Sequence, residues 1–300
     1  MQAVWMVLSA LVFSTMAVCV KFAAAHFNNA ELVFYRGVIG VVCMAVFARV
    51  QGTPLATRVL PMHIWRSVVG VAALSTWFYA IAHLPLATAM TLNYMSSVWI
   101  AVFLVGGSLM FAKAGQRVAS QGPLVLAILA SFAGVIMLLQ PTMDQNQAFA
   151  GMVGLLSGLG AAFAYMQVMV LARMGEPEAR TVFYFAVGSA IAGALGMAVV
   201  GVSPWVWQHA LWLLPIGLLA SLGQLCMTKA YSMSTNHGGT LMVANLQYSG
   251  IVFSALFSLL LFGDQIPLLG WAGMALIIVS AVAATVLRAR AAPNAPAQDH

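Results

Sequence analysis

The sequence contains few charged residues, and this shortage excludes a water-soluble fold. Of its 300 residues only 6% are charged and 63% are hydrophobic, and the mean hydropathy is +0.98. Soluble domains carry about a quarter charged residues. A globule of 31.7 kDa cannot bury this much apolar surface, so we expect an all-α integral membrane protein whose solvent is lipid.

Residues that could carry chemistry at membrane depth are also missing. The three cysteines lie inside apolar segments and have neither metal-site nor disulfide spacing. All six acids and all six histidines fall in loops or at segment ends, whereas hydrolysis needs a Ser or Cys beside a base and a metal site needs clustered ligands. We therefore expect no enzyme, no metal and no cofactor, and a purely structural role is the other disfavoured alternative.

Apolar segments fill almost the whole chain, each near the length of about 20 residues that spans a bilayer. Pro, Gly and charge clusters divide it into ten, at 2–24, 30–50, 62–84, 86–111, 121–140, 149–173, 179–201, 210–232, 237–262 and 267–288. All eleven prolines fall in loops or first turns, so the sequence predicts ten continuous helices. Residues 291–300 are expected to form a disordered cytoplasmic tail.

The basic residues favour one orientation in the membrane. They fall in or beside alternate loops and the C-terminus, at Arg49, Arg58, Arg66, Lys113, Arg117, Arg173, Arg180, Lys229, Arg288 and Arg290. Cytoplasmic loops carry such an excess of Lys and Arg. We therefore expect a multi-pass protein of the cell (inner) membrane with both termini in the cytoplasm, which requires an even number of crossings.

Four short phrases recur in order along the chain at a nearly constant offset. "LSAL" at 8–11 matches "LSGL" at 156–159, and "VFYR" at 33–36 matches "VFYF" at 182–185; Ala80 corresponds to Ala230, and "NYMSSVWIAVF" from Asn93 aligns with "QYSGIVFSALF" from Gln247. We interpret this as a five-helix unit duplicated over 1–146 and 147–290. Because five is odd, the second copy enters the membrane from the opposite face, which predicts two inverted repeats around a central cavity.

The chain resembles a known family of carriers. Its "VKFAAAHFNNAELVFYRG", "FYAIAHLPLATAMTL" and "LLLFGDQIPLLGWAGMALIIVSAV" stretches are similar to the EamA family of the drug/metabolite transporter superfamily. It departs from the usual pattern in having Asp264 where Glu is common and in lacking an acid after segment 4. The resemblance implies a carrier of small metabolites, and YddG-type exporters of amino acids are the favoured branch.

Polar and aromatic side chains at mid-depth are the candidates for lining the cavity. Segments 3, 4, 6, 8 and 9 supply Tyr79, Tyr94, Ser97, Trp99, Tyr165, Gln224, Asn245 and Tyr248. Such residues also form ordinary hydrogen bonds between membrane helices, so each has a structural alternative. As a group they favour a small polar or zwitterionic solute, whose ammonium could bind aromatic faces.

Two basic residues are candidates for gates. Arg36 either extends to the outer headgroups or fixes a positive charge near the outer mouth, in a cluster with Lys21 and Glu31. Lys229 and Tyr79 occupy equivalent places in the two repeats near opposite faces. For Lys229, anchoring at the inner face and a gating or carboxylate-binding role are both open.

The function expected from these features is secondary transport. The first segment of each half contains no acid, and a proton-coupled carrier usually keeps a carboxylate or His at depth. We expect alternating-access export of small polar metabolites, amino acids above all, uncoupled from protons. The alternatives are a nucleoside, vitamin or sugar-nucleotide carrier and a multidrug proton antiporter. The expected partners are the solute and the bilayer, with no nucleic acid, and a monomer is compatible with the sequence.

Overall fold

The computed structural model describes residues 2–100, 102–103, 122–139, 145–233, 243 and 245–291, and every structural statement below concerns these residues. They form helices without strands in this part of the chain. The helices are α1 (Gln2–Ala23), α2 (Asn29–Val50), α3 (Leu60–His83), α4 (Leu86–Tyr94), α6 (Gly122–Leu139), α7 (Gln145–Arg173), α8 (Glu178–Val200), α9 (Trp207–Ala210), α10 (Leu213–Ser232), α12 (Ser249–Phe262) and α13 (Leu268–Ala291).

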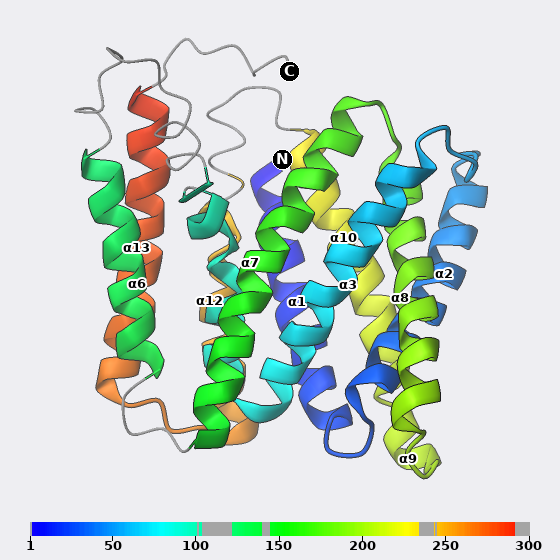
Figure 1. The fold of residues 1–300 in the computed structure, drawn as a ribbon, viewed down its shortest axis with the longest axis horizontal. Coiled ribbons are helices and arrows are strands. Elements are labelled where there is room, and N and C mark those ends of the chain that lie inside the picture. The colour runs from blue at the N-terminus through cyan, green and yellow to red at the C-terminus, as the bar shows by residue number, and fades with distance from the viewer. Residues whose placement is uncertain are drawn as a thin grey trace.

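The long helices stand side by side and their connections fall at two faces (Figure 1). We call the face where α1 begins and α13 ends the terminal face; the α2–α3 and α7–α8 connections also lie there. We call the opposite face, with the α1–α2 connection and α9, the distal face.

The expectation of a helical membrane protein is confirmed. Six helices are long and apolar enough to cross a bilayer, namely α1, α2, α3, α7, α8 and α10, and shorter apolar helices lie within α6, α12 and α13. Large apolar side chains point outward, among them Val42 on α2, Leu195 on α8 and Ile136 on α6. Surface of this kind is stable only against lipid.

The helices pack mainly across the two halves of the sequence. Contacts join α2 to α8, α4 to α12 and α6 to α13; they also join α1 to α10 and α12, α3 to α7 and α8, α7 to α4, and α10 to α2. The short helix α9 is left aside, and the others are paired in order: α1 with α7, α2 with α8, α3 with α10, α4 with α12 and α6 with α13. Exchanging the paired helices leaves this set of contacts unchanged. For example, α1 on α10 becomes α7 on α3.

Backbones approach closely where α2 meets α8. A β-carbon at Gly37 would collide with the backbone of Ala190, and one at Gly193 would lie 2.5 Å from the backbone of Phe34. Small residues allow such approach in membranes, where dispersion and weak hydrogen bonds replace the hydrophobic effect between helices. The α2–α8 pair is therefore a close contact between the halves.

The expectation of ten continuous helices is wrong at two places. A turn at Met95 ends α4, and a second turn at Gln247 and Tyr248 precedes α12. Both keep right-handed helical angles at the cap residue, but the amides of Met95, Tyr248, Gly250 and Ile251 bond to carbonyls three residues back. Each break is a short stretch of 3₁₀ geometry. Such a stretch forms without proline, so the positions of the prolines in the sequence did not predict it.

We expect Gly37→Val to lower the free energy of unfolding by about 1–3 kcal/mol, because the added side chain overpacks the α2–α8 contact. The measurement is unfolding of the purified protein in detergent. Val38→Ile is the matched control, because Val38 is the next residue on α2 and faces outward. An equal effect of both changes would contradict close packing at Gly37.

Candidate solute-binding site

Two arginines meet at one aromatic ring inside the bundle. The guanidinium carbon of Arg36 lies 5.0 Å from the ring centre of Phe185, and that of Arg66 lies 4.3 Å from the same centre. The two cations are therefore less than about 10 Å apart. Phe185 occupies the position that corresponds to Arg36 in the "VFYR" and "VFYF" phrases, so the two equivalent residues contact each other.

Each arginine reaches toward the interior rather than toward its nearer face. Arg36 lies about 10 Å along α2 from the distal end and Arg66 about 9 Å along α3 from the terminal end, at 1.5 Å per residue. A β-carbon at Gly70, one turn deeper on α3, would collide with Nη1 of Arg66 and lie 2.9 Å from the Phe185 ring. Gly70 therefore leaves the space that the Arg66 guanidinium occupies.

The two cations are buried and lack a carboxylate partner among the residues that the structure describes. Arg36 is 5% exposed and Arg66 is 3% exposed. Nε of Arg36 and both Nε and Nη1 of Arg66 have no hydrogen-bond partner there. A buried charge without a partner costs several kcal/mol, and a shared ring offsets only about 2 kcal/mol or less of it.

Neutral polar groups surround the pair. Arg36, Ser221 and Gln224 line a cavity of about 10 Å³, the size of one water molecule. The Tyr165 hydroxyl accepts a hydrogen bond from Gln247 at 3.4 Å. Ser221 and Gln224 are thus the neutral polar groups beside Arg36, and the other walls of this small cavity are apolar.

The structure separates the cluster expected around Arg36. Lys21 donates to Asp264 at 3.2 Å and to the Leu84 carbonyl at 3.1 Å. Glu31 accepts from the Ser203 hydroxyl at 2.6 Å and caps its own helix. Arg36 contacts neither of them, so the expected cluster is wrong, and its buried guanidinium does not extend outward to the headgroups. The other interpretation, a fixed positive charge facing a polar path, stays a prediction.

The candidate cavity residues divide into those near the arginines and those elsewhere. Gln224 and Tyr165 belong to the polar surroundings just described. Ser97 lies beside the Tyr248 hydroxyl, and Tyr94 packs its own hydroxyl against Gly250 between α4 and α12. The buried Asn245 Oδ1 has no partner in the described part of the chain.

Three candidates lie away from this interior. Tyr79 stacks on His83 near the distal face, and Trp99 contacts Phe103 and Phe132. Lys229 is exposed near the terminal face, with its ammonium 4.3 Å from the ring centre of Trp5. The cavity beside Arg36 has room for about one water molecule, whereas a cavity of about 330 Å³ lies at the terminal face.

Sequence reasoning missed Arg66 and Phe185. Arg66 was counted with the basic loops, because it lies near the start of an apolar segment. Its signal was its position a full turn inside α3 (Leu60–His83), where an ionisable residue is a functional candidate by default. Phe185 gave no signal, because an aromatic residue in an apolar helix is usual.

Polar and aromatic contacts close the distal face. The carboxylate of Asp264 accepts from Lys21, from the Ser258 hydroxyl at 2.6 Å and from the Leu86 amide at 3.3 Å. The rings of Phe22 and Trp212 stack at 4.8 Å, and those of His26 and His209 at 3.5 Å. These contacts join α1, the start of α4, the loop after α12 and the α9–α10 region.

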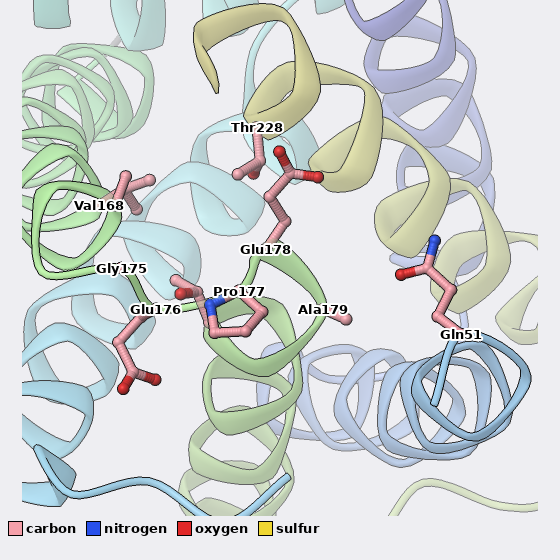
Figure 2. Close-up of a pocket in the computed structure, with 10 residues that line it drawn as sticks. Gln51, Val168, Gly175, Glu176, Pro177, Glu178, Ala179 and Thr228 are labelled. Carbon is pink, nitrogen blue, oxygen red and sulfur yellow. The ribbon is translucent and has the colours of Figure 1, made fainter. Parts of the chain in front are cut away.

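A cavity of about 330 Å³ opens at the terminal face (Figure 2). Its walls come from the ends of α2, α7 and α10 and from the start of α8, and include Gln51, Val168, Glu178 and Thr228. In Figure 2 the Glu178 side chain points toward Thr228, whereas the Glu176 carboxylate points away from it. The two faces of the bundle therefore differ.

Glu176 ties the α7–α8 connection to the α2–α3 region. Its carboxylate accepts from Thr57 at 3.0 Å and from Arg180 at 3.1 Å and contacts His63 Nε2 at 3.0 Å. Burial alone would raise the pKa of Glu176, but the hydrogen bonds from His63, Arg180 and Thr57 and the charge of Arg180 outweigh it and lower the pKa below its ordinary value of 4.5.

The lowered pKa makes the Glu176 contribution depend on pH. It is present above pH 4.5, the value without these partners, and is lost as the pH falls through the lower folded-state value. We expect Glu176→Gln to destabilise the protein by about 2 kcal/mol at neutral pH and the difference from wild type to shrink toward pH 3. Thermal unfolding between pH 7 and pH 3 measures this.

Glu178→Gln is the control for this measurement. Glu178 carries the same group two residues away and forms no hydrogen bond or ion pair with any described residue. Its variant should follow the pH dependence of the wild type. A Glu176→Gln deficit that stays constant down to pH 3 would show that the carboxylate charge is not responsible.

Comparison with known proteins identifies relatives along nearly the whole chain. The chain is 32% identical over 277 residues to the pseudopaline exporter CntI of Pseudomonas aeruginosa (strain UCBPP-PA14), covering 92% of this chain and 93% of that protein. It is 26% identical to an uncharacterized transporter of Helicobacter pylori (strain J99), covering 91% and 90%.

A solved crystal structure shares the fold, with a TM-score of 0.67 at 18% identity, covering 97% of this chain and 98% of the other. No family model matches the chain. The apolar helices of the chain, and its 32% identity to a named exporter over 92% of its length, both indicate a membrane transporter. The chain belongs to the family of multi-pass membrane transporters that includes the pseudopaline exporter, a family of the drug/metabolite transporter type.

Proposed function

We propose that the protein is a secondary transporter that exports small polar metabolites of the amino-acid type by alternating access. The observation that carries this proposal is the 32% identity, over 92% of the chain, to a protein named as an exporter. That name supports outward transport, and the buried polar interior around Arg36 supports a polar solute.

The reciprocal helix contacts support two inverted repeats, residues 1–146 and 147–290. Each of the main helix contacts between the halves that are named above has a counterpart when the halves are exchanged. The two helix turns also lie close together in the alignment, because Asn93 aligns with Gln247. Gln247 lies in one turn, and the other, at Met95, comes two residues after Asn93. Two similar units that pack reciprocally can exchange conformations, which is the basis of alternating access.

The difference between the faces supports a conformation open toward the terminal face. Asp264 and its donors hold the distal face closed, while the 330 Å³ cavity lies at the terminal face. The 3₁₀ turns at Met95 and Tyr248 supply points where α4 and α12 can bend. On this proposal the terminal face is cytoplasmic, in agreement with its basic residues, and the protein lies in the inner membrane.

Transport uncoupled from protons is part of the proposal. The four acids in the described part of the chain lie at helix ends or in connections, and Glu31, Glu176 and Asp264 are held by hydrogen bonds. A carboxylate at the middle of the bundle, the usual proton carrier, is missing from that part. The solute therefore moves down its own concentration gradient or is exchanged for another solute.

The transport assay uses protein reconstituted in liposomes loaded with amino acids or nucleosides. Efflux of amino acids above that of protein-free liposomes, equal with and without an imposed pH gradient, is the expected result. Efflux that stays concentrative only while a proton gradient is maintained would refute uncoupled transport. Efflux of nucleosides alone would refute the amino-acid class.

We expect Asp264→Asn to open the distal face at the expense of the terminal face. The variant loses the Lys21 ion pair and accepts a weaker hydrogen bond from Ser258. These losses lower the free energy that holds the distal face closed by about 1 kcal/mol, which changes the ratio of the two conformations about fivefold. Single cysteines report each face in a background without Cys19, Cys43 and Cys226: Ala87→Cys beneath Asp264 and Thr228→Cys in the terminal cavity.

The measurement is the rate of labelling by a maleimide reagent. Asp264→Asn should raise labelling at position 87 and lower it at position 228, because alternating access makes the two openings exclusive. Asp264→Glu, which keeps the charge, is the control. If labelling rises at both positions, the change has loosened the bundle and alternating access is contradicted.

A further inference from the structure

We propose that the solute carries two acid groups and that Arg36 and Arg66 bind them at the Phe185 ring. This inference rests on the proposed transport function and specifies the substrate class of its site. Both guanidinium groups are almost completely buried, at 5% and 3% exposed, and both contact one ring.

The charge balance of the site requires an anion. The described acids lie elsewhere: Glu31 bonds Ser203, Glu176 bonds Arg180 and His63, Asp264 bonds Lys21, and Glu178 points toward Thr228. Two positive charges in a medium of low dielectric are neutralised when the solute brings two negative charges. A solute with one charge would leave a net charge buried, and a neutral solute would leave two.

The available donors favour acid groups over other acceptors. Nε of Arg36, and Nε and Nη1 of Arg66, are buried without a partner within the described chain. A guanidinium presents parallel N–H donors that match the two oxygens of a carboxylate. Gln224 and Ser221 beside Arg36 can bond the remaining polar groups of such a solute.

The path of the Arg66 side chain indicates that its position is specific. Helical side chains usually lean toward the N-terminus of their helix, which for Arg66 would lead to the terminal face. Its Nη1 instead lies over Gly70, one turn toward the C-terminus of α3. The absence of a side chain at Gly70 gives the guanidinium room to reach Phe185.

The dianion can be a dicarboxylate or a phosphate monoester, and the two guanidinium groups favour the dicarboxylate. They come from different helices, α2 and α3, and bind separate sides of a solute more readily than one phosphoryl group. The probes are glutarate, L-glutamate, L-glutamine and O-phospho-L-serine. Binding is measured by the shift in melting temperature in detergent, and transport by efflux from liposomes.

Glutarate and L-glutamate should bind at least about tenfold more tightly than L-glutamine, because each matched guanidinium–carboxylate pair contributes a charge-assisted hydrogen bond. Arg36→Gln and Arg66→Gln should each abolish this preference, and Arg36→Lys should recover part of it. Arg49→Gln, which removes the same charge from the exposed end of α2, should leave the preference unchanged.

The Gly70→Ala variant distinguishes an effect on the position of the Arg66 guanidinium from an effect on folding. The collision is with the mobile end of Arg66 and with the edge of a ring, so the variant should fold with a nearly unchanged melting temperature. Its affinity for glutarate should nevertheless fall about tenfold, and the loss should be absent in Arg66→Gln, where nothing remains to be displaced.

Equal binding of glutarate and L-glutamine, or a preference that survives Arg36→Gln and Arg66→Gln, would overturn the inference. Preference for O-phospho-L-serine over glutarate would overturn its dicarboxylate part. Failure of both dianions to bind would also overturn it. Efflux of L-glutamine without dianion binding would leave the proposed export function standing and refute only the anion site, so the two failures are distinguishable.

Discussion

Hydrocarbon offers no hydrogen bonds, and the structure is organised by this constraint. Each backbone amide and carbonyl must find its partner inside the protein, so helices fill the span and polar side chains bond to nearby carbonyls. The Ser9 hydroxyl donates to the Gly223 carbonyl at 2.8 Å, and Ser131 and Ser280 bond each other at 2.7 Å across α6 and α13. In such surroundings a buried cation without a partner is costly, which is why the arginine pair at Phe185 bears on function.

The same constraint explains how the halves hold together. Lipid tails are as apolar as the helix surfaces, so helices associate by close packing rather than by exclusion of water. Gly37 and Gly193 bring α2 and α8 into backbone contact, and this contact also places Arg36 beside its counterpart Phe185. The packing that stabilises the bundle and the geometry of the site are therefore set by one interface.

The charged groups at the two faces differ from those in the interior in whether they have partners. Charged groups that have partners lie near the faces, where Asp264 and Glu176 tie connections together. Two buried charged groups that lack a described partner, Arg36 and Arg66, lie in the interior. The hydrogen bonds and ion pairs at the faces can break and form at little cost in free energy, because water replaces them. The charges of the interior arginines are neutralised only when a solute binds. Solute binding can therefore be linked to the exchange between the two conformations.

By itself the sequence determined the helical membrane fold and the approximate span of nearly every helix, because apolar length and loop punctuation are local properties. It also located Gln224 and Tyr165 as polar residues at depth, whereas it placed Arg36 near the outer mouth. It failed at Met95 and Tyr248, where 3₁₀ turns form without proline, and at Arg66, whose place near a segment end looked like a loop. Only the tertiary structure decided that Arg36 and Arg66 meet at Phe185. That meeting depends on the packing of α2, α3 and α8 and on the space left at Gly70, and neither is encoded in a single segment.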